Sequence, residues 1–316
     1  MSGYRGDGMV ITRSASAESG TRLGRLAAAT TPGAFVVLWS SAFIAGVIGL
    51  DAAPPLLLTL CRFALAGVLL AVVALAVRAP WPKGRALGHV VVAGLLLQAV
   101  QFGAFYTAMS LGVTGAMAAL VQGLHPVLTA ILAVPLLGER VSSRQWAGFV
   151  LGALGVVLAV AEKLSSAGPA LLLCVGGLLG LSLGTLYQKR FCADMDLRSG
   201  QAVQLLASVP VIGVLALTVE SPHVSAWGPF TAAVLWLALV NSIGAFSLLY
   251  LMLRRSQASR ASSLFFLTPS VTAVMAWVIL DQPLSPLVVL GLVVSGSGVA
   301  LATRPRSAGS AVPARA

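Results

Sequence analysis

Runs of about twenty apolar residues follow one another along almost the whole chain, and this pattern limits the fold more than any other feature. Hydrophobic residues make up 58% of the 316 residues, and charged residues only 9%. A run of that length crosses a bilayer as a helix, because a helix satisfies its backbone hydrogen bonds internally. The chain is therefore predicted to be an all-α, polytopic membrane protein.

The positions of the apolar runs predict ten transmembrane helices. Strands of a membrane barrel are not predicted, since they would alternate polar and apolar residues over shorter segments. The ten predicted helices cover residues 33–50, 54–77, 87–109, 113–137, 145–161, 168–188, 200–219, 228–253, 261–280 and 286–303.

The net charge of +11 is read as a signal of topology. If ten helices follow a cytoplasmic N-terminus, every lysine and arginine except Arg62 and Lys163 falls on the cytoplasmic side. This bias is typical of multi-pass proteins of the plasma or inner membrane. Both termini are predicted to be cytoplasmic, in disordered tails of residues 1–32 and 304–316. The bilayer is the expected surrounding, and nucleic-acid binding is not predicted.

The chain also repeats part of its own sequence. Residues 118–159 align without gaps on residues 261–302, at an offset of 143 residues. The identical positions include a proline inside each apolar run, Pro126 and Pro269. An internal repeat in a membrane chain is typical of transporters, whose substrate site lies where broken helices of the two halves meet.

Five helices in each repeat is an odd number, so the second copy would enter the membrane in the opposite orientation to the first. The sequence therefore predicts two inverted five-helix repeats, at residues 33–162 and 168–303. Rocking of such halves against each other exposes a central site to each side of the membrane in turn.

Short motifs recur in the same order in both halves. The first half contains Leu137-Gly-Glu-Arg140 and Trp146-Ala-Gly148, and the second contains Tyr250-Leu-Met-Leu-Arg-Arg and Leu267-Thr-Pro269. Together with Phe105-Tyr-Thr-Ala-Met-Ser-Leu-Gly, these motifs resemble the EamA family of the drug/metabolite transporter superfamily. The resemblance implies ten helices, an inverted pair of five-helix units, and movement of small metabolites, often by export.

The resemblance and the repeat predict a secondary transporter that exports a small metabolite, such as an amino acid or a related compound, by alternating access. A coupling ion or proton is a further expected partner, and no cofactor, metal site or oligomeric state is predicted. Two alternatives remain open: a membrane scaffold that does not transport, and a lipid or nucleotide-sugar carrier of the same fold.

An enzyme is not predicted, although Gly180-Leu-Ser182-Leu-Gly184 matches the nucleophile elbow of hydrolases. That elbow requires a strand before the serine, a helix after it, and a histidine and an acid within reach. Ser182 instead falls inside a predicted helix, and no acidic residue lies in the middle of any predicted span.

Arg62 is the most costly residue to place in the membrane, at about 2.5–3.5 kcal/mol for arginine at a helix centre. It is expected to face the protein interior or a water-filled cavity. The functional interpretation is that its guanidinium receives a substrate carboxylate or phosphate through two hydrogen bonds. The alternative is a structural arginine, held by neighbouring carbonyls or extended outward past Cys61 and Thr59.

Four further residues are predicted to contact substrate. His125 can donate, accept and titrate near neutral pH, and Gln122 lies one turn earlier on the same helix face. Tyr106 adds a polar group, and Trp39 could supply an aromatic wall. The alternative for all four is packing of the helix bundle.

Three residues are predicted to act in hinge or gating movements. Pro126 and Pro269 each remove a backbone donor, which suits a hinge, a cavity lining or a plain kink. Glu139 lies near Arg140 and Arg144 at the predicted cytoplasmic end of the fourth span. It is expected either to form a solvated or capping ion pair, or to act as a switch that breaks when the inner gate opens.

Overall fold

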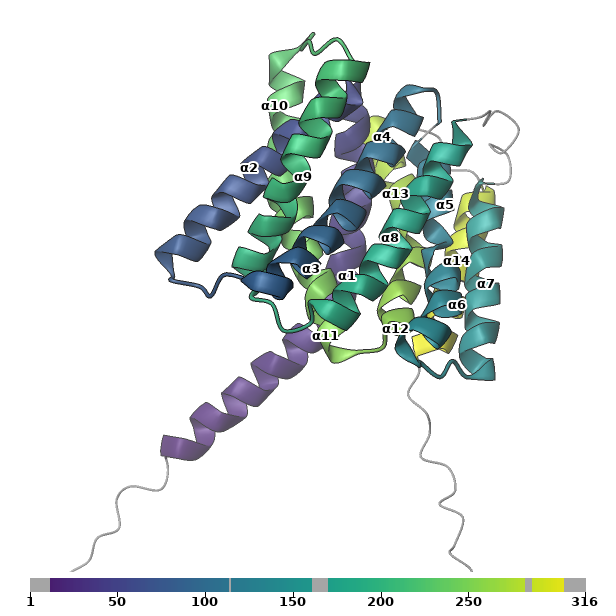
Figure 1. The fold of residues 1–316 in the computed structure, drawn as a ribbon. Helices are drawn as coiled ribbons and strands as arrows, with labels where there is room; N and C mark the ends of the chain where they lie inside the picture. Colours follow the sequence, from purple (N-terminus) through teal and green to yellow (C-terminus); the bar gives the residue numbers. More distant parts are fainter. Residues whose placement is uncertain (1–11, 114, 161–169, 282–285, 304–316) are drawn as a thin grey trace, which may run out of the picture.

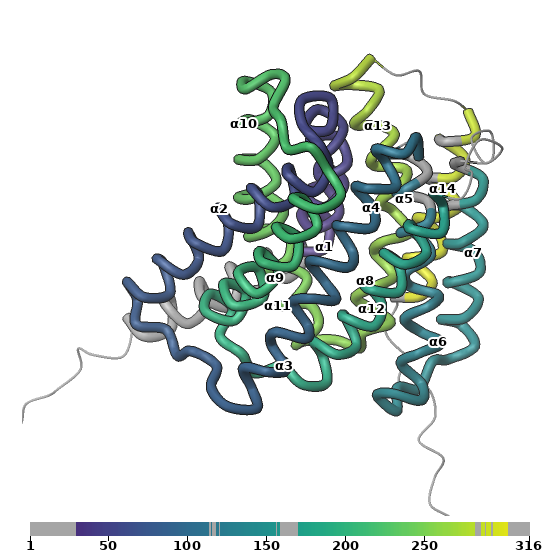
Figure 2. Tube along the Cα trace, turned by 45° about the horizontal axis from the view of Figure 1, so that its top comes forward, coloured from purple at the N-terminus to yellow at the C-terminus, as the bar shows by residue number. Residues whose placement is uncertain are grey.

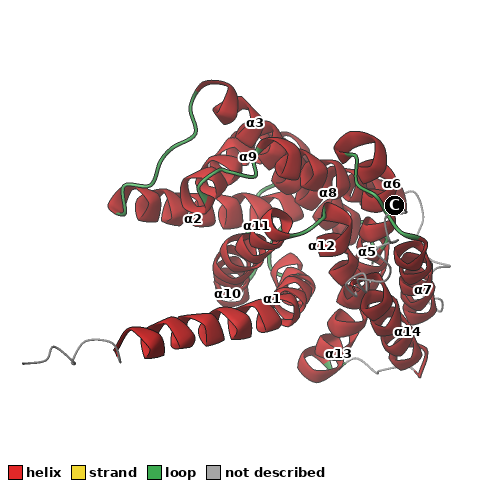
Figure 3. Ribbon diagram, turned by 90° about the horizontal axis from the view of Figure 1, so that it is seen from below, coloured by secondary structure: helices red, strands yellow, loops and turns green. Residues whose placement is uncertain are grey.

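The structure is a computed structural model, which describes residues 12–113, 115–160, 170–281 and 286–303. Every regular element in these ranges is a helix, as Figure 3 shows in a view from below. The predicted all-α class is therefore confirmed. Lys163 and the predicted C-terminal tail lie outside the described residues.

The helices run in consecutive, mostly antiparallel passes (Figure 1). Those of the first half are α1 (Thr12–Leu50), α2 (Pro55–Ala76), α3 (Gly84–Gly94), η1 (Leu95–Val100), α4 (Gln101–Ser110), α5 (Gly115–Gly123), α6 (His125–Leu137) and α7 (Ser143–Val160). Those of the second half are α8 (Leu171–Phe191), α9 (Leu197–Val219), α10 (Trp227–Trp236), η3 (Leu237–Ala245), α11 (Phe246–Arg255), α12 (Ala258–Ser262), η4 (Ser263–Leu267), α13 (Thr268–Leu280) and α14 (Pro286–Thr303).

Several of these stretches are long and apolar enough to cross a membrane. Shorter apolar helices cover Val121–Leu137 and Val289–Ala302, and the count of ten spans stays a prediction. Among the described residues, the seven longer candidates are Thr30–Leu50, Pro55–Ala76, Gly84–Ser110, Leu171–Phe191, Leu197–Val219, Trp227–Arg255 and Ala258–Leu280.

The first helix is longer than the sequence predicts. A disordered tail is expected up to residue 32, whereas α1 begins at Thr12 and contains Pro32. The helix can extend this far because residues 21–31 contain only one glycine, Gly24, and several alanines that favour helix. The helix therefore begins within the residues that the sequence assigns to a tail.

Lysines and arginines in the last turns of helices gather at one end of the bundle. The connections after α2, α6, α8 and α11 gather at this end (Figure 1), and cations there bond to backbone carbonyls. Lys189 donates to the carbonyl of Leu253 at 3.1 Å, and Arg254 donates to the carbonyl of Met195. We call this the basic end, defined by Lys189, Arg190, Arg254 and Arg255; its position relative to the cell remains a prediction.

The opposite end is tied together by a carboxylate. Glu220, which follows α9, accepts hydrogen bonds from the backbone N–H groups of Leu56 at 2.9 Å and Leu57 at 3.2 Å. A carboxylate at a helix N-terminus satisfies free N–H groups and interacts favourably with the helix dipole. The backbone of Ser225 adds a 2.9 Å bond to the carbonyl of Ala52.

Glycines let α7 and α14 pack closely, and the two helices lie side by side in Figures 1 and 2. A Cβ atom on Gly155 would lie 2.4 Å from the backbone nitrogen of Ser295. A Cβ on Gly298 would lie 2.5 Å from the backbone nitrogen of Gly152. Small residues allow such close approach between membrane helices, so this pair joins the last helices of the two halves.

Two long helical passes contain a π-helical segment near their middle. The first joins α3, η1 and α4, and the second joins α10, η3 and α11. Leu95, where η1 begins, lies 143 residues before Ala238, the second residue of η3. The two segments begin 142 residues apart, at Leu95 and Leu237, so their spacing is close to the offset of the sequence repeat in a region that the repeat alignment does not cover. Such turns are frequent at functional sites.

Two other passes are broken next to the repeated prolines. The first stops at Leu124, between α5 and α6, and Pro126 lies in the first turn of α6. The second passes through the 3₁₀ segment η4, and Pro269 lies in the first turn of α13. Proline is tolerated in a first helical turn because its missing N–H would have no partner there.

Candidate functional site

Arg62 of α2 lies fully buried at the centre of a group of side chains from three elements. Its Nε and one terminal nitrogen donate to the hydroxyl of Ser242 at 3.1 and 2.9 Å. The other terminal nitrogen donates to the hydroxyl of Tyr106 at 3.0 Å. The outward-extended alternative is therefore wrong, because no part of the side chain reaches the surface.

The guanidinium of Arg62 is surrounded by neutral groups. Its central carbon lies 4.3 Å from the ring centre of Phe102, which is within cation–π range. Within the described ranges, no carboxylate forms an ion pair with it. The three hydrogen bonds occupy three of the five N–H donors that an arginine carries. The charge is thus positioned but not neutralised by any carboxylate among the described residues.

The π-helical segment η3 brings Ser242 to Arg62. Ser242 and Asn241 are polar residues within the apolar run of residues 228–253, and both are buried. Asn241 donates to the carbonyl of Leu38, which fixes η3 against α1. The hydropathy of the run gives no reason to select Ser242.

Trp39 and Gln122 form a direct contact between α1 and α5. The indole Nε1 of Trp39 donates to Oε1 of Gln122 at 2.6 Å, and both side chains are buried. Gln122 and His125 do not bond to a common partner. Gln122 accepts from Trp39, whereas His125 contacts Ser182.

His125 is fully buried at the start of α6. Its Nδ1 lies 2.9 Å from the hydroxyl of Ser182 on α8 and 3.1 Å from the hydroxyl of Thr129. No carboxylate contacts His125 in the described part of the chain, and Ser182 is inside a helix, so the elements of a hydrolase elbow are not assembled. Nor do the described residues place three His, Cys, Asp or Glu side chains close enough to hold a metal ion.

Aromatic rings connect the Arg62 group to the His125 group. The ring of Phe265 lies 4.6 Å from His125 and 4.9 Å from Trp39. Phe246 lies 5.0 Å from Trp39 and 5.9 Å from Phe102. The four predicted contact residues and Arg62 thus belong to one continuous interior cluster, which we call the central cluster: Arg62, Tyr106, Phe102, Ser242, Phe246, Trp39, Gln122, Phe265, His125 and Ser182.

Glu139 lies apart from the central cluster, at the basic end. Its carboxylate is buried and accepts from the backbone nitrogens of Ala258 at 2.7 Å and Ser259 at 3.3 Å. The hydroxyl of Ser259 adds a third bond at 2.8 Å. Among the described residues neither Arg140 nor Arg144 forms an ion pair with it. Glu139 instead caps α12 in the other half of the chain.

Further polar residues extend from the central cluster toward the basic end. The hydroxyl of Tyr250 donates to Oε1 of Gln204 at 2.6 Å, and Nε2 of Gln204 donates to Gln188 at 2.7 Å. The ring of Tyr250 lies 5.7 Å from Phe246. Gln188 is buried as well.

The profile of the EamA-like transporter family matches this sequence twice, at residues 33–161 and 168–304. The uncharacterized inner membrane transporter YedA of Escherichia coli K12 is 27% identical over 274 residues, which cover 85% of this chain and 88% of YedA. A probable amino-acid metabolite efflux pump of the same strain is 26% identical, covering 84% of this chain and 90% of the pump.

Two more relatives complete the comparison. A probable terminal-alkyne amino-acid exporter of Streptantibioticus cattleyicolor is 30% identical, and the alignment covers 85% of this chain and 91% of the exporter. A crystal structure of a protein that is 23% identical matches with a TM-score of 0.71, covering 86% of this chain and 95% of the other. That structural match shows a common helical fold.

Proposed function

We propose, from the premise that this chain belongs to the EamA-like transporter family, that it is a secondary transporter exporting a small metabolite. The substrate we propose is an amino acid or a related compound that carries a carboxylate. The chain is a multi-pass membrane protein, and we place it in the cell membrane with both termini in the cytoplasm.

The buried, unneutralised charge of Arg62 carries this proposal. An isolated charge inside a membrane protein is costly, and such residues usually mark a substrate or ion pathway. Ser242 and Tyr106 hold the guanidinium without cancelling its charge. A substrate carboxylate could use the two remaining N–H donors and supply the missing negative charge. We therefore assign Arg62 as the group that binds the substrate carboxylate.

The rest of the central cluster suits the remainder of an amphipathic substrate. Phe102, Phe246 and Phe265 provide aromatic faces between Arg62 and His125. Trp39, Gln122 and His125 add polar atoms at the far side. The names of two relatives, an amino-acid metabolite efflux pump and an amino-acid exporter, favour export of such a compound.

We further propose ten transmembrane helices arranged as two inverted five-helix repeats. The two family matches, the paired helix breaks beside Pro126 and Pro269, and the corresponding positions of η1 and η3 in the two halves support this arrangement. In such folds, rocking of the halves exposes a central site to each side in turn. Pro126 and Pro269 would act as hinges.

Glu139 is proposed to hold the basic end closed during this cycle. Its three hydrogen bonds join the connection after α6, in the first half, to α12 in the second half. Opening of this end would separate the two elements and break the contact. A contact that exists in one state only can bias the equilibrium between two states.

The test is a comparison of metabolites in medium and cytoplasm between cells that express the wild type and cells that express Arg62→Ala at equal membrane abundance. Carboxylate-bearing compounds are expected to accumulate in the medium with the wild type only. Arg62→Lys serves as the charge-conserving control and should restore little export, because lysine cannot form the bidentate hydrogen bonds that arginine forms with a carboxylate.

Equal profiles for all three proteins, each folded and abundant, would favour the membrane scaffold over the transporter. Enrichment of lipid-linked or nucleotide-sugar compounds would favour a carrier of that class. The scaffold does not account for the central position of Arg62, and the carrier ranks below the exporter because two relatives are named as an amino-acid metabolite efflux pump and an amino-acid exporter.

A further inference from the structure

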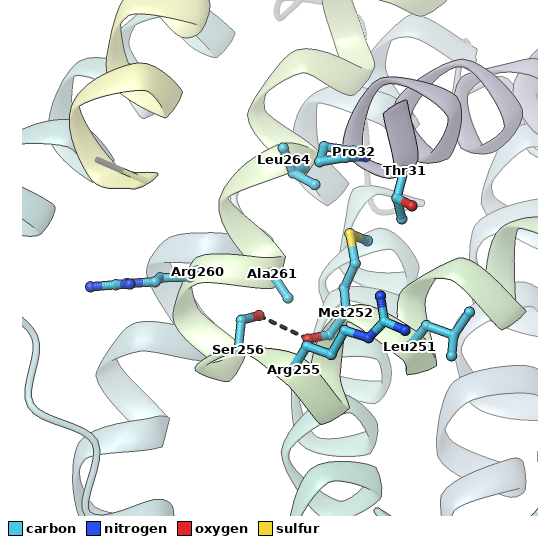
Figure 4. Close-up of a pocket in the computed structure, with 9 residues that line it drawn as sticks. All are labelled: Thr31, Pro32, Leu251, Met252, Arg255, Ser256, Arg260, Ala261 and Leu264. Atoms are coloured by element: carbon cyan, nitrogen blue, oxygen red, sulfur yellow. Dashed lines mark hydrogen bonds between the residues drawn. The ribbon is translucent and has the colours of Figure 1, made fainter. Parts of the chain in front are cut away.

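A cavity of about 380 Å³ opens at the basic end, between α1 and the turn that joins α11 to α12. Figure 4 shows Pro32, Met252 and Leu264 in its wall, with Arg255 extending beside Met252. Binding cavities for small organic molecules usually measure about 300–1,000 Å³. The cavity is thus large enough for a small metabolite, and it shares no residue with the central cluster.

The cavity and the central cluster are nevertheless neighbours along the chain. Leu264 lies in η4, and the next residue, Phe265, contacts both Trp39 and His125. Ala261, also in the cavity wall, belongs to α12, which Glu139 caps. The cavity therefore lies on the side of the broken pass that faces the basic end, next to the contact proposed as its gate.

Two arginines line the cavity, and no ion pair neutralises either of them among the residues that the structure describes. Arg255 is exposed to solvent, and Arg260 is partly buried. The Nε atom of Arg260 is buried and has no hydrogen-bond partner. In Figure 4, Arg260 projects away from the other side chains, so Arg255 is the cation closest to the apolar wall.

Two neighbouring cations of the basic end donate hydrogen bonds to backbone carbonyls. Lys189 donates to the carbonyls of Leu253 and Ser256, and Arg254 donates to the carbonyl of Met195. These side chains tie helix ends together. Among the residues whose side chains the structure describes, none forms such a contact with Arg255, although it follows Arg254 directly on the same helix, so its charge is available to a ligand.

We propose that this cavity is a loading site for the carboxylate end of an amphipathic metabolite, with Arg255 binding the carboxylate. Met252 and Leu264 would contact the apolar part of the ligand, and Arg260 would add positive potential at the rim. This inference rests on the proposed function. The metabolite binds Arg255 first and reaches Arg62 when the contact between Glu139 and α12 opens.

The test measures binding of hexanoate, which combines a carboxylate with a short hydrocarbon chain. The full-length protein carries Arg62→Ala, so that binding at the central cluster does not contribute, and is held in phosphatidylcholine nanodiscs. Saturable binding by ligand-observed NMR is expected, and Arg255→Gln should weaken it about fivefold or more through loss of a charge-assisted hydrogen bond. Arg254→Gln is the matched control and should leave the affinity unchanged.

Absence of saturable binding, or equal weakening by Arg254→Gln and Arg255→Gln, would overturn the proposal. Nanodiscs with phosphatidylglycerol separate two sources of anion. Unchanged hexanoate binding there supports a metabolite site. Loss of hexanoate binding in these nanodiscs would show that a lipid headgroup occupies the cavity, and the loading role would be wrong.

Transport kinetics distinguish failure of this inference from failure of the proposed function. In membrane vesicles, with Arg62 intact, Arg255→Gln should raise KM for substrate presented at the basic end and leave kcat unchanged. If Arg62→Ala abolishes transport while Arg255→Gln alters neither constant, the transporter stands and the loading site fails.

Discussion

At the scale of single residues, the protein keeps a full positive charge among neutral partners. Ser242, Tyr106 and Phe102 position Arg62 through hydroxyls and an aromatic face. A purely structural arginine would be expected to stabilise the fold, whereas a binding arginine is retained at a cost to stability. This difference can be measured.

Arg62→Met is expected to leave the thermal stability of the purified protein unchanged or to raise it, and to abolish transport of carboxylates. Methionine has similar length and adapts to apolar surroundings, and the relief of burying an isolated charge should offset the loss of the hydrogen bonds to Ser242 and Tyr106. Thermal unfolding in detergent and a transport assay measure the two quantities. A large fall in the unfolding temperature would instead identify Arg62 as structural.

The contact between Trp39 and Gln122 gives a second prediction. Trp39→Phe should lower the free energy of unfolding by about 1–3 kcal/mol, because Oε1 of Gln122 would stay buried without its donor. The double variant with Gln122→Met should recover part of this loss, since both polar partners are then removed. Denaturant unfolding of the four proteins gives the coupling, and additive losses would contradict a direct bond.

The sequence was informative about single residues only where physical cost made them conspicuous. Arg62 and His125 were selected because a charge and a histidine are rare inside apolar runs, and the structure buries both. The sequence does not indicate Ser242 at all, and it indicates Ser182 only through a hydrolase motif, since serine is common in membrane helices and carries little cost. Their importance depends on partners that are 180 and 57 residues away.

At the scale of helices, carboxylates at helix N-termini join the two halves of the chain at both ends. Glu139 caps α12 at the basic end, and Glu220 caps α2 at the opposite end. The hydropathy pattern placed both residues at helix ends, but it could not show which distant N-terminus each would contact. The repeat alignment does not identify these contacts either, because the position that matches Glu139 is Gln282, which carries no carboxylate.

Glu139→Gln is expected to make the basic end open more often. The neutral amide loses the favourable interaction with the N-terminus of α12, so the contact between the halves weakens. A cysteine at Ser263, which is buried beside α12, should then react several-fold faster with a water-soluble thiol reagent, in a background without native cysteines. Glu220→Gln, at the other end, is the control and should leave this rate unchanged.

The close packing of α7 and α14 makes a prediction about stability alone. Gly155→Ala places a methyl group 2.4 Å from backbone and side-chain atoms of Ser295, which cannot move aside without shifting the helix. The free energy of unfolding should fall by about 1–3 kcal/mol. Gly176→Ala in α8, where no atom lies within 4 Å of the added carbon, should have little effect. Equal effects would contradict this account of the packing.

At the scale of the whole molecule, helical class and the approximate helix positions followed from hydropathy, because apolar length fixes what can cross a bilayer. The third predicted span, residues 87–109, corresponds to Gly84–Ser110, and the eighth, residues 228–253, to Trp227–Arg255. The π-helical segments inside both passes could not be predicted, since one extra residue in a turn leaves the hydropathy of the run unchanged.

The proposed orientation is tested by cysteine labelling in intact cells. In a background without native cysteines, a membrane-impermeant reagent should label Ser221→Cys, near the end that Glu220 ties together. It should not label Ser143→Cys, at the start of α7, until the cells are opened. Both serines are exposed to solvent. The reverse pattern would place the basic end outside the cell.

The π-helical segment η3 has a genetic consequence. Deletion of a single codon within residues 237–245 would leave an apolar run that can still form a regular helix and span the bilayer. The extra residue of the wide turn would then be lost, so the helix on either side would keep its register, while the side chains within the turn, Ser242 among them, would move to new positions. One such event would therefore exchange the residues that face Arg62 in a single step, so related genes could diverge in specificity there without any change in overall hydropathy.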